Sequence, residues 1–285
     1  MSRILICGGH SFVGKGLCEL LNQHNWNVDV FSRGIENRTE NIVFGDYLTI
    51  QHNPFLYERY DIVINLAVIK DGTIRSNLDY IRSLVSFCKM HHVKKLIHFS
   101  SIMVYNYQLK DVDEDTSIET LEKTDKKGYG EFKIAVDQYL YSVIETLPFE
   151  LILVRPGYVL DDNRPCPFIK RLPLGITVIK GNKHSKQPIV QRDCIHNAII
   201  QIIETEKNRL VYHLFPNNGM TKYEYAKPTS RYVLSLPKFL FDGIPSVLCK
   251  IGIIPKSLYS RFAGMYIESN FSSKHTEEKL NIKFY

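Results

Sequence analysis

Residues 4–14 hold the feature that most constrains the fold, a short strand that runs directly into a glycine-rich turn. Residues 4–7 (Ile-Leu-Ile-Cys) are predicted to be a buried strand, and Gly8-Gly9-His10-Ser11-Phe12-Val13-Gly14 follows at once. From Val13 onward, Leu17, Leu20 and Leu21 have the spacing of one helix face. A strand, a tight glycine turn and a helix in this order are typical of the first unit of a parallel α/β sheet.

The alternation of strands and helices continues along the chain. Helices are predicted around Leu78–Cys88 and over 129–144, and further strands over 27–31, 41–44, 61–66, 95–100, 150–155 and 210–214. This pattern predicts a Rossmann-type doubly wound parallel sheet of about seven strands. The alternation loosens after Pro156. We therefore expect a sheet domain over 1–158, completed by about 191–215, and a smaller discontinuous lobe made of 159–190 and 216–285.

Composition excludes several classes of protein. The chain has 285 residues, 44% of them hydrophobic and 23% charged, which is globular and argues against disorder. The net charge of +6 is scattered, without the basic runs of a nucleic-acid protein, and suits an anionic small ligand. Six separate cysteines favour reduced thiols and a cytoplasmic location. No metal spacing and no apolar run of about 18 residues is present, so neither a metal site nor a spanning helix is expected.

The glycine turn also carries a prediction about binding. Gly8 permits the tight turn, Gly14 lets the helix pack closely on the strand, and the helix N-terminus can offer N–H groups to a pyrophosphate. The turn resembles the Gly-x-x-Gly-x-x-Gly fingerprint of the extended short-chain dehydrogenase/reductases, the NAD-dependent epimerase/dehydratase group. Ser11 stands at the middle glycine position. The resemblance assigns Gly8, Ser11, Phe12, Val13 and Gly14 to cofactor binding.

Other strand ends extend this resemblance. NAD-preferring relatives carry Asp or Glu at the end of the second strand, where this chain has Ser32 followed by Arg33. A hydroxyl and a cation suit a 2′-phosphate, which favours NADP over the alternative, NAD. The resemblance further assigns Asp46 to the adenine, Leu66 and Ala67 to the cofactor ribose, and Pro156, at the end of the sixth strand, to cofactor binding.

The predicted catalytic residues lie on one helix and one strand end. Tyr129 and Lys133 have Tyr-x-x-x-Lys spacing, which places them on one helix face. A nearby ammonium favours tyrosinate, so Tyr129 can act as an acid or base. Lys133 is also expected to reach the ribose hydroxyls of the cofactor. The segment Ser100-Ser101-Ile102-Met103-Val104-Tyr105 resembles the Ser-Ser-x-x-Val-Tyr-Gly segment of the family, which implies that Ser101 donates a hydrogen bond to the substrate oxygen.

The same segment, residues 100–105, limits which reactions of the family are expected. Sugar 4,6-dehydratases carry Asp-Glu before Val-Tyr, whereas Ile102 and Met103 transfer no protons, so dehydration is not expected. Enzymes that couple 3,5-epimerisation to reduction carry a cysteine where this chain has Met103, so that reaction is also disfavoured. Two hypotheses about the reaction remain. The first is a keto-sugar reductase that exchanges NADP(H), which Ser32 and Arg33 favour. The second is a nucleotide-sugar 4-epimerase that keeps its NAD bound. A non-catalytic cofactor-binding module is a third, disfavoured because Tyr129 and Lys133 are both present.

The parts of the chain that resemble the family least are expected to choose the substrate. The smaller lobe is therefore a predicted substrate-binding lobe, and the substrate is expected to be an anionic nucleotide sugar. Relatives often pair helices, so a homodimer is an open expectation. Residues 236–265 mix apolar residues with Lys238, Lys250, Lys256 and Arg261. This composition permits contact with a membrane surface, although lobe helices packed on the core or on a dimer partner are the more common explanation.

Overall fold

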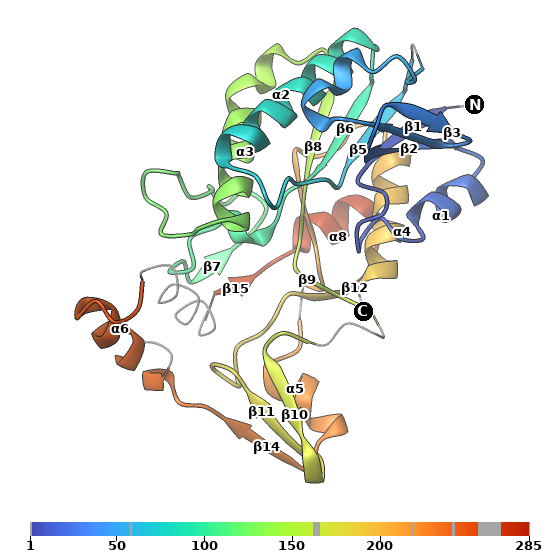
Figure 1. Cartoon of the computed structure of the whole chain (residues 1–285). Helices are drawn as coiled ribbons and strands as arrows, with labels where there is room; N and C mark the ends of the chain where they lie inside the picture. The colour runs from blue at the N-terminus through green and yellow to red at the C-terminus, as the bar shows by residue number, and fades with distance from the viewer. Residues whose placement is uncertain are drawn as a thin grey trace. The chain divides into compact units, whose positions relative to one another are not determined.

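The chain folds into two compact units, each assembled from separate stretches of sequence. The computed structural model describes residues 2–57, 59–161, 166–217, 219–240, 243–255 and 269–284 (Figure 1). Unit 1 consists of Met1–Val104, Gly128–Pro156 and Arg192–Tyr212, and unit 2 of Tyr105–Lys127, Gly157–Gln191 and His213–Tyr285. Unit 2 therefore includes 105–127, a segment that the sequence pattern assigned to the sheet domain.

The main sheet lies almost entirely in unit 1 and has the strand order β13-β8-β6-β5-β1-β2-β4-β3. The pairings from β4 through β2, β1, β5 and β6 to β8 are parallel. This arrangement confirms the predicted Rossmann-type α/β fold. The eight strands are β1 (Arg3–Cys7), β2 (Asn27–Arg33), β3 (Asn37–Thr39), β4 (Ile42–Gly45), β5 (Ile62–Asn65), β6 (Lys95–Phe99), β8 (Glu150–Pro156) and β13 (Val211–Leu214).

One strand of this sheet was not predicted. β3 pairs antiparallel with β4 at the edge, and its residues Asn37, Arg38 and Thr39 are all polar. A strand without apolar alternation has no periodic signal in the sequence. The other seven strands match the predicted ones to within two residues at each end.

Helices cover both faces of the sheet, because consecutive strand residues point to opposite sides. Leu5 and Cys7 belong to a core cluster with α2 (Ile74–Met90) and α3 (Tyr129–Val143). Ile4 and Ile6 are equally buried and alternate with them. α1 (Leu17–Gln23) packs with α4 (Arg192–Glu204). The 3₁₀ helices of unit 1 are η1 (Tyr47–His52), η2 (Ile102–Val104) and η3 (Ile144–Thr146).

Unit 2 contains three small sheets in its described part. β10 (Ile169–Leu172), β11 (Ile176–Ile179) and β14 (Tyr232–Ser235) form one, β9 (Tyr158–Leu160) pairs with β12 (Ile189–Gln191), and β7 (Asp111–Val112) pairs with β15 (Asn270–Phe271). The helices are α5 (Lys222–Ala226), α6 (Gly243–Lys250), α8 (Lys274–Leu280), η4 (Pro173–Gly175), η5 (Lys227–Thr229) and η6 (Lys238–Leu240).

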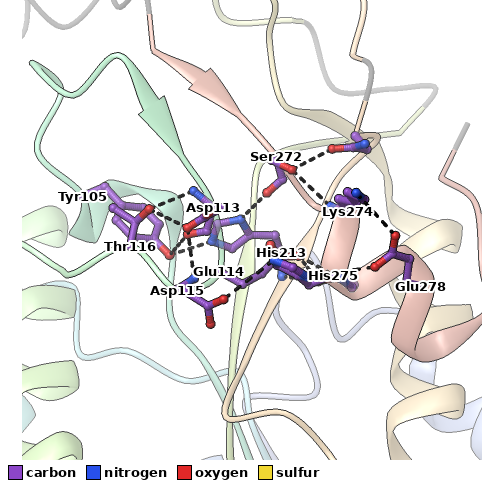
Figure 2. A network of polar contacts seen from close by, with 12 residues as sticks. Tyr105, Asp113, Glu114, Asp115, Thr116, His213, Ser272, Lys274, His275 and Glu278 are labelled. Carbon is purple, nitrogen blue, oxygen red and sulfur yellow. Dashed lines mark hydrogen bonds and ion pairs between the residues drawn. The ribbon is translucent and has the colours of Figure 1, made fainter.

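A buried polar network explains why 105–127 belongs to unit 2 (Figure 2). His213 Nδ1 lies 2.7 Å from the carbonyl oxygen of Ser272 and must donate to it, and His213 Nε2 lies 2.6 Å from the Tyr105 hydroxyl. Glu114 Oε1 accepts hydrogen bonds from the backbone N–H and the hydroxyl of Thr276, each at 2.8 Å. These contacts join the segment after η2 to the C-terminal helix, two parts of the chain that are far apart in sequence.

Candidate active site

The predicted phosphate-binding turn follows β1 and packs tightly against its surroundings. Gly8 has a φ of 79°, and a Cβ at this position would lie 3.0 Å from the backbone nitrogen of Ala67. A Cβ at Gly14 would lie 2.3 Å from the carbonyl oxygen of Gly9. Neither position accepts a side chain without a shift of backbone atoms. The two glycines are therefore required by the conformation of the turn.

The helix after this turn begins later than the sequence pattern predicted. α1 starts at Leu17 rather than Val13, because Gly16 has a left-handed φ of 85° and interrupts the helical path. Ser11 Oγ accepts a hydrogen bond of 3.2 Å from the N–H of Gly14. Phe12 and Val13 consequently lie in a loop. The prediction that a helix N-terminus follows the glycine turn directly is wrong in this respect.

A second polar cluster lies at the end of β2. Ser32 Oγ is 2.9 Å from His10 Nδ1, and the mostly exposed Arg33 guanidinium has a loose ion pair of 3.9 Å with Asp71. The imidazole of His10, within the glycine turn, therefore lies beside the Ser32 hydroxyl at the end of β2, and the Arg33 guanidinium follows in the chain. His10 was not among the predicted site residues, and its place within the glycine turn was the one signal for it.

The remaining predicted cofactor residues follow other parallel strands. Asp46 comes after β4, where its carboxylate accepts the N–H of Leu48 at 2.9 Å and caps η1. Leu66 and Ala67 come after β5, and Pro156 is the last residue of β8. The carboxyl ends of parallel strands share one edge of a sheet. The fold therefore brings all of these residues to the edge that carries the glycine turn.

Tyr129 and Lys133 lie one turn apart on α3, and Ser101 follows β6. Lys133 Nζ is 5.6 Å from the centre of the Tyr129 ring. Tyr129 is 39% exposed, so its phenol is accessible to a ligand. Ser101 Oγ accepts a hydrogen bond of 3.2 Å from the N–H of Met103. Because this contact uses only a lone pair, the Ser101 hydroxyl is still able to donate its proton.

Lys133 is buried although its partner Tyr129 is exposed. Its Nζ donates a hydrogen bond to the carbonyl oxygen of Phe99, the last residue of β6. Burial lowers the pKa of the Lys133 ammonium to about 8, and the carboxylate of Asp137 partly opposes this shift. A lysine with a pKa near neutrality can exchange protons at physiological pH.

Most of the chain matches the model of one protein family. Residues 4–190, well over half of the chain, match the model of the NAD dependent epimerase/dehydratase family. The chain belongs to this family. No curated protein sequence matches it.

Solved structures of epimerase-family proteins share the fold of the chain. UDP-N-acetylglucosamine 4-epimerase from Bacillus cereus has a TM-score of 0.72 at 16% identity, covering 100% of this chain and 94% of that one. UDP-glucose 4-epimerase from Thermotoga maritima, solved with UDP-glucose, has a TM-score of 0.67 at 16% identity, with 99% and 93% covered. A human epimerase family protein solved with NADPH has a TM-score of 0.65 at 17% identity, with 99% and 94% covered.

A buried ion pair holds α3, the helix with the predicted catalytic residues, in place. Asp137 and Arg155 are both fully buried, and Asp137 Oδ2 lies 3.0 Å from Arg155 Nη2. The same oxygen accepts a hydrogen bond of 2.7 Å from Ser100, the residue before Ser101. Asp137 thereby ties α3 to the ends of β6 and β8. The sequence offered one signal for it, its position one helical turn after Lys133.

A second buried network lies beneath Lys133. Asn65 Oδ1 accepts hydrogen bonds from the Tyr80 hydroxyl at 2.7 Å and from the N–H of Ala67 at 3.1 Å. Its amide nitrogen therefore donates to His98 Nδ1 at 2.9 Å, which leaves the proton of a neutral His98 on Nε2. A cavity of about 10 Å³, close to the size that one water molecule needs, is lined by Asn65, His98 and Lys133. Sequence reasoning missed this network.

Other predicted features concern metals, thiols and membranes. The described residues contain no cluster of three or more potential metal ligands. None of the six cysteines is in a disulfide, and burial raises the pKa of the Cys7 thiol to about 12. No helix in the described part of the chain is long and apolar enough to span a membrane.

Proposed function

We propose that this protein is an NADP-dependent keto-sugar reductase. One observation supports the proposal above all: the end of β2 carries Ser32, Arg33 and the neighbouring His10, where a carboxylate would favour NAD. A carboxylate there binds both ribose hydroxyls and repels a 2′-phosphate. A hydroxyl and a guanidinium attract that phosphate through charge-assisted hydrogen bonds.

The residues present fit this cofactor. Gly8 and Gly14 keep side chains out of the turn that would hold the pyrophosphate, and Ser11 stabilises the turn from within. Arg33 and Ser32 would bind the 2′-phosphate, Asp46 the adenine, Leu66 and Ala67 the ribose, and Pro156 would border the nicotinamide side. When bound, NADPH supplies a hydride to a carbonyl carbon.

The chain's own residues would orient the substrate carbonyl and transfer one proton to it. Ser101 and Tyr129 would hydrogen-bond the carbonyl oxygen and orient it. Tyr129 Oη would give its proton to that oxygen as negative charge develops there. The ammonium of Lys133 would favour the tyrosinate left behind. Two hydroxyl donors and one cation are sufficient for reduction of a ketone, whereas Ile102 and Met103 provide no second acid for an elimination.

We also propose a nucleotide sugar as the substrate and the cytoplasm as the location. The UDP-glucose 4-epimerase from Thermotoga maritima, whose fold this chain shares, was solved with UDP-glucose. Six cysteines without a disulfide are typical of a reducing compartment.

The cofactor preference tests the proposal. We expect NADPH to bind at least tenfold more tightly than NADH in a fluorescence titration. Arg33→Ala should weaken NADPH binding by about ten- to a hundredfold, the value of one charged hydrogen bond, and should leave NADH unchanged. Arg75→Ala, an exposed arginine on α2, is the matched control.

Two results would overturn the assignment. Protein that purifies with tightly bound NAD and interconverts a nucleotide sugar without added cofactor would be a 4-epimerase. The protein would be a cofactor-binding module if it bound NADPH tightly but reduced no nucleotide keto-sugar. In that case Tyr129→Phe would bind NADPH as the unchanged protein does and would cause no further loss of activity.

A further inference from the structure

The sheet formed by β10, β11 and β14 in unit 2 has two faces of different character. Its register places Leu172 opposite Ile176 and Ile176 opposite Tyr232. The next row in the same face contains Lys170, Val178 and Leu234. Since paired residues and alternate residues share a face, this outer face consists of five apolar residues and one lysine: Leu172, Ile176, Val178, Tyr232, Leu234 and Lys170.

The opposite face of this sheet forms the core of the lobe. Thr177 is 1% exposed and hydrogen-bonded to Ser230 at 2.6 Å, and Ile179 is fully buried. α5 packs against β11. The sheet therefore already has a buried apolar side, and folding does not require a second one.

The outer face is nevertheless apolar and open. Tyr232 and Leu234 are each 54% exposed, and Leu172 is 39% exposed. Leu174, at the tip of the hairpin between β10 and β11, is 84% exposed. A sheet with one solvated face normally alternates apolar and polar residues. Contiguous exposed apolar residues on such a face mark a surface that contacts something other than water.

Basic residues are concentrated in the part of the sequence that builds this sheet. The segments 166–186 and 225–235, which build the sheet and its flanks, contain Lys170, Arg171, Lys180, Lys183, Lys186, Lys227 and Arg231 but no Asp or Glu. Seven positive charges exceed the net charge of +6, so the rest of the chain has a net charge of −1. The Arg231 guanidinium lies 5.4 Å from the centre of the Tyr232 ring, directly beside the apolar face.

We propose that this outer face docks on an anionic lipid surface. An apolar patch that includes Lys170 and has Arg231 beside it matches the boundary between acyl chains and phosphate headgroups, with Leu172, Leu174 and Leu234 entering it and Lys170 and Arg231 reaching the phosphates. A second copy of the chain would bring Lys170 and Arg231 against the same two cations, which disfavours self-association through this face.

The proposal also gives a physical basis to the membrane contact that the composition of 236–265 permitted. The structure describes 236–240 and 243–255 of that stretch. On α6 and just after it, Ile244, Val247 and Ile251 are 46–63% exposed beside Lys250. This second apolar and basic surface lies in the same unit. The proposal is independent of the reaction that unit 1 performs.

Vesicle sedimentation with the full chain tests the proposal. We expect the protein to pellet with vesicles of phosphatidylcholine mixed with phosphatidylglycerol, to stay in the supernatant with pure phosphatidylcholine, and to be released by high salt. Leu174→Ser/Leu234→Ser should lower the partition coefficient about tenfold or more, because the two leucines no longer bury apolar surface in the lipid. Lys170→Gln/Arg231→Gln should have an effect of about the same size.

Matched controls come from unit 1. Met90→Ser removes an exposed apolar residue at the end of α2, and Lys89→Gln removes the neighbouring charge. Both should pellet like the unchanged protein. Thermal unfolding of each variant shows whether it is folded, and tubes without vesicles exclude aggregation.

Three outcomes would overturn the proposal. The first is a protein that remains in the supernatant with the anionic vesicles. The second is loss of binding only in Ile244→Ser/Val247→Ser, which would move the contact to α6. The third is a dimer, seen by light scattering, that dissociates in Leu174→Ser/Leu234→Ser, which would mean that a second copy covers the face.

Discussion

At the scale of single residues, Tyr129 and Lys133 show how one helix turn separates two environments. Their spacing places them on the same side of α3, yet Tyr129 is 39% exposed and Lys133 is 3% exposed. The exposed phenol can meet a substrate. The buried ammonium has lost its hydration, and this desolvation lowers its pKa to about 8.

Tyr129→Phe tests the assigned role of the phenol. The variant keeps the ring and loses the proton, so turnover should fall by about a hundred- to ten-thousandfold. NADPH affinity, measured by titration, should stay within about threefold, because the fold of α3 does not depend on an exposed hydroxyl. Tyr139→Phe on the same helix is the control and should retain full activity. Loss of NADPH binding in Tyr129→Phe would contradict the role of a proton donor.

At the scale of elements, α3 is anchored by one carboxylate. Asp137 meets Arg155 from β8 and Ser100 after β6, in a fully buried position. A buried ion pair contributes little net stability compared with apolar residues, but removing one partner leaves an uncompensated charge. The pair therefore serves to hold α3, and with it Tyr129, beside the end of β6.

Removal of the Asp137 carboxylate should lower the stability of the folded protein. Asp137→Ala should lower the free energy of unfolding by about 3–5 kcal/mol, measured by urea denaturation. The double variant Asp137→Leu/Arg155→Met should lose much less, since no buried charge is left unpaired. Asp79→Ala, which breaks a surface pair with Arg82, should cost no more than about 1 kcal/mol. Equal losses in the first two variants would show that the ion pair is not the reason for the effect.

At the scale of the whole molecule, buried histidines make stability depend on pH. Burial lowers the pKa of His98 well below its usual range, with the nearby Lys133 as a second cause. Burial also lowers the pKa of His196, whose Nε2 lies 2.7 Å from the carbonyl oxygen of Val13. Below pH 6.5 the unfolded chain binds protons at these rings that the folded chain does not bind. Folding is therefore penalised as the pH falls through 6.5.

The expected result is an acid-sensitive unfolding transition. Between pH 6.5 and 5.5, the free energy of unfolding should fall by about 1 kcal/mol for each fully neutral buried histidine, and the slope should approach about 1.4 kcal/mol per pH unit at lower pH. His98→Asn should make this dependence shallower, whereas His184→Gln, at an exposed position in unit 2, should leave it unchanged. Urea denaturation at several pH values measures both. An identical slope in His98→Asn would contradict the role given to His98.

The strand periodicity was sufficient to predict the main sheet, because buried parallel strands are short apolar runs between turns. The same periodicity could not predict β3, whose residues are polar, or the start of α1, which Gly16 delays. The motif spacing pointed to Ser101, Tyr129 and Lys133. It did not reveal the contacts of His10, Asn65, His98 and Asp137, because their side-chain partners are 15 to 37 residues away and lie on other elements.

The sequence by itself determined the family, the order of the strands along the chain and the strand ends that carry the predicted cofactor and catalytic residues. Local pattern and residue type encode these properties directly. Only the tertiary structure decided which residue of the Tyr129–Lys133 pair is buried, which carboxylate anchors α3, and which face of the β10–β11–β14 sheet remains open. Burial and exposure depend on what packs on each surface, and those neighbours come from distant parts of the chain.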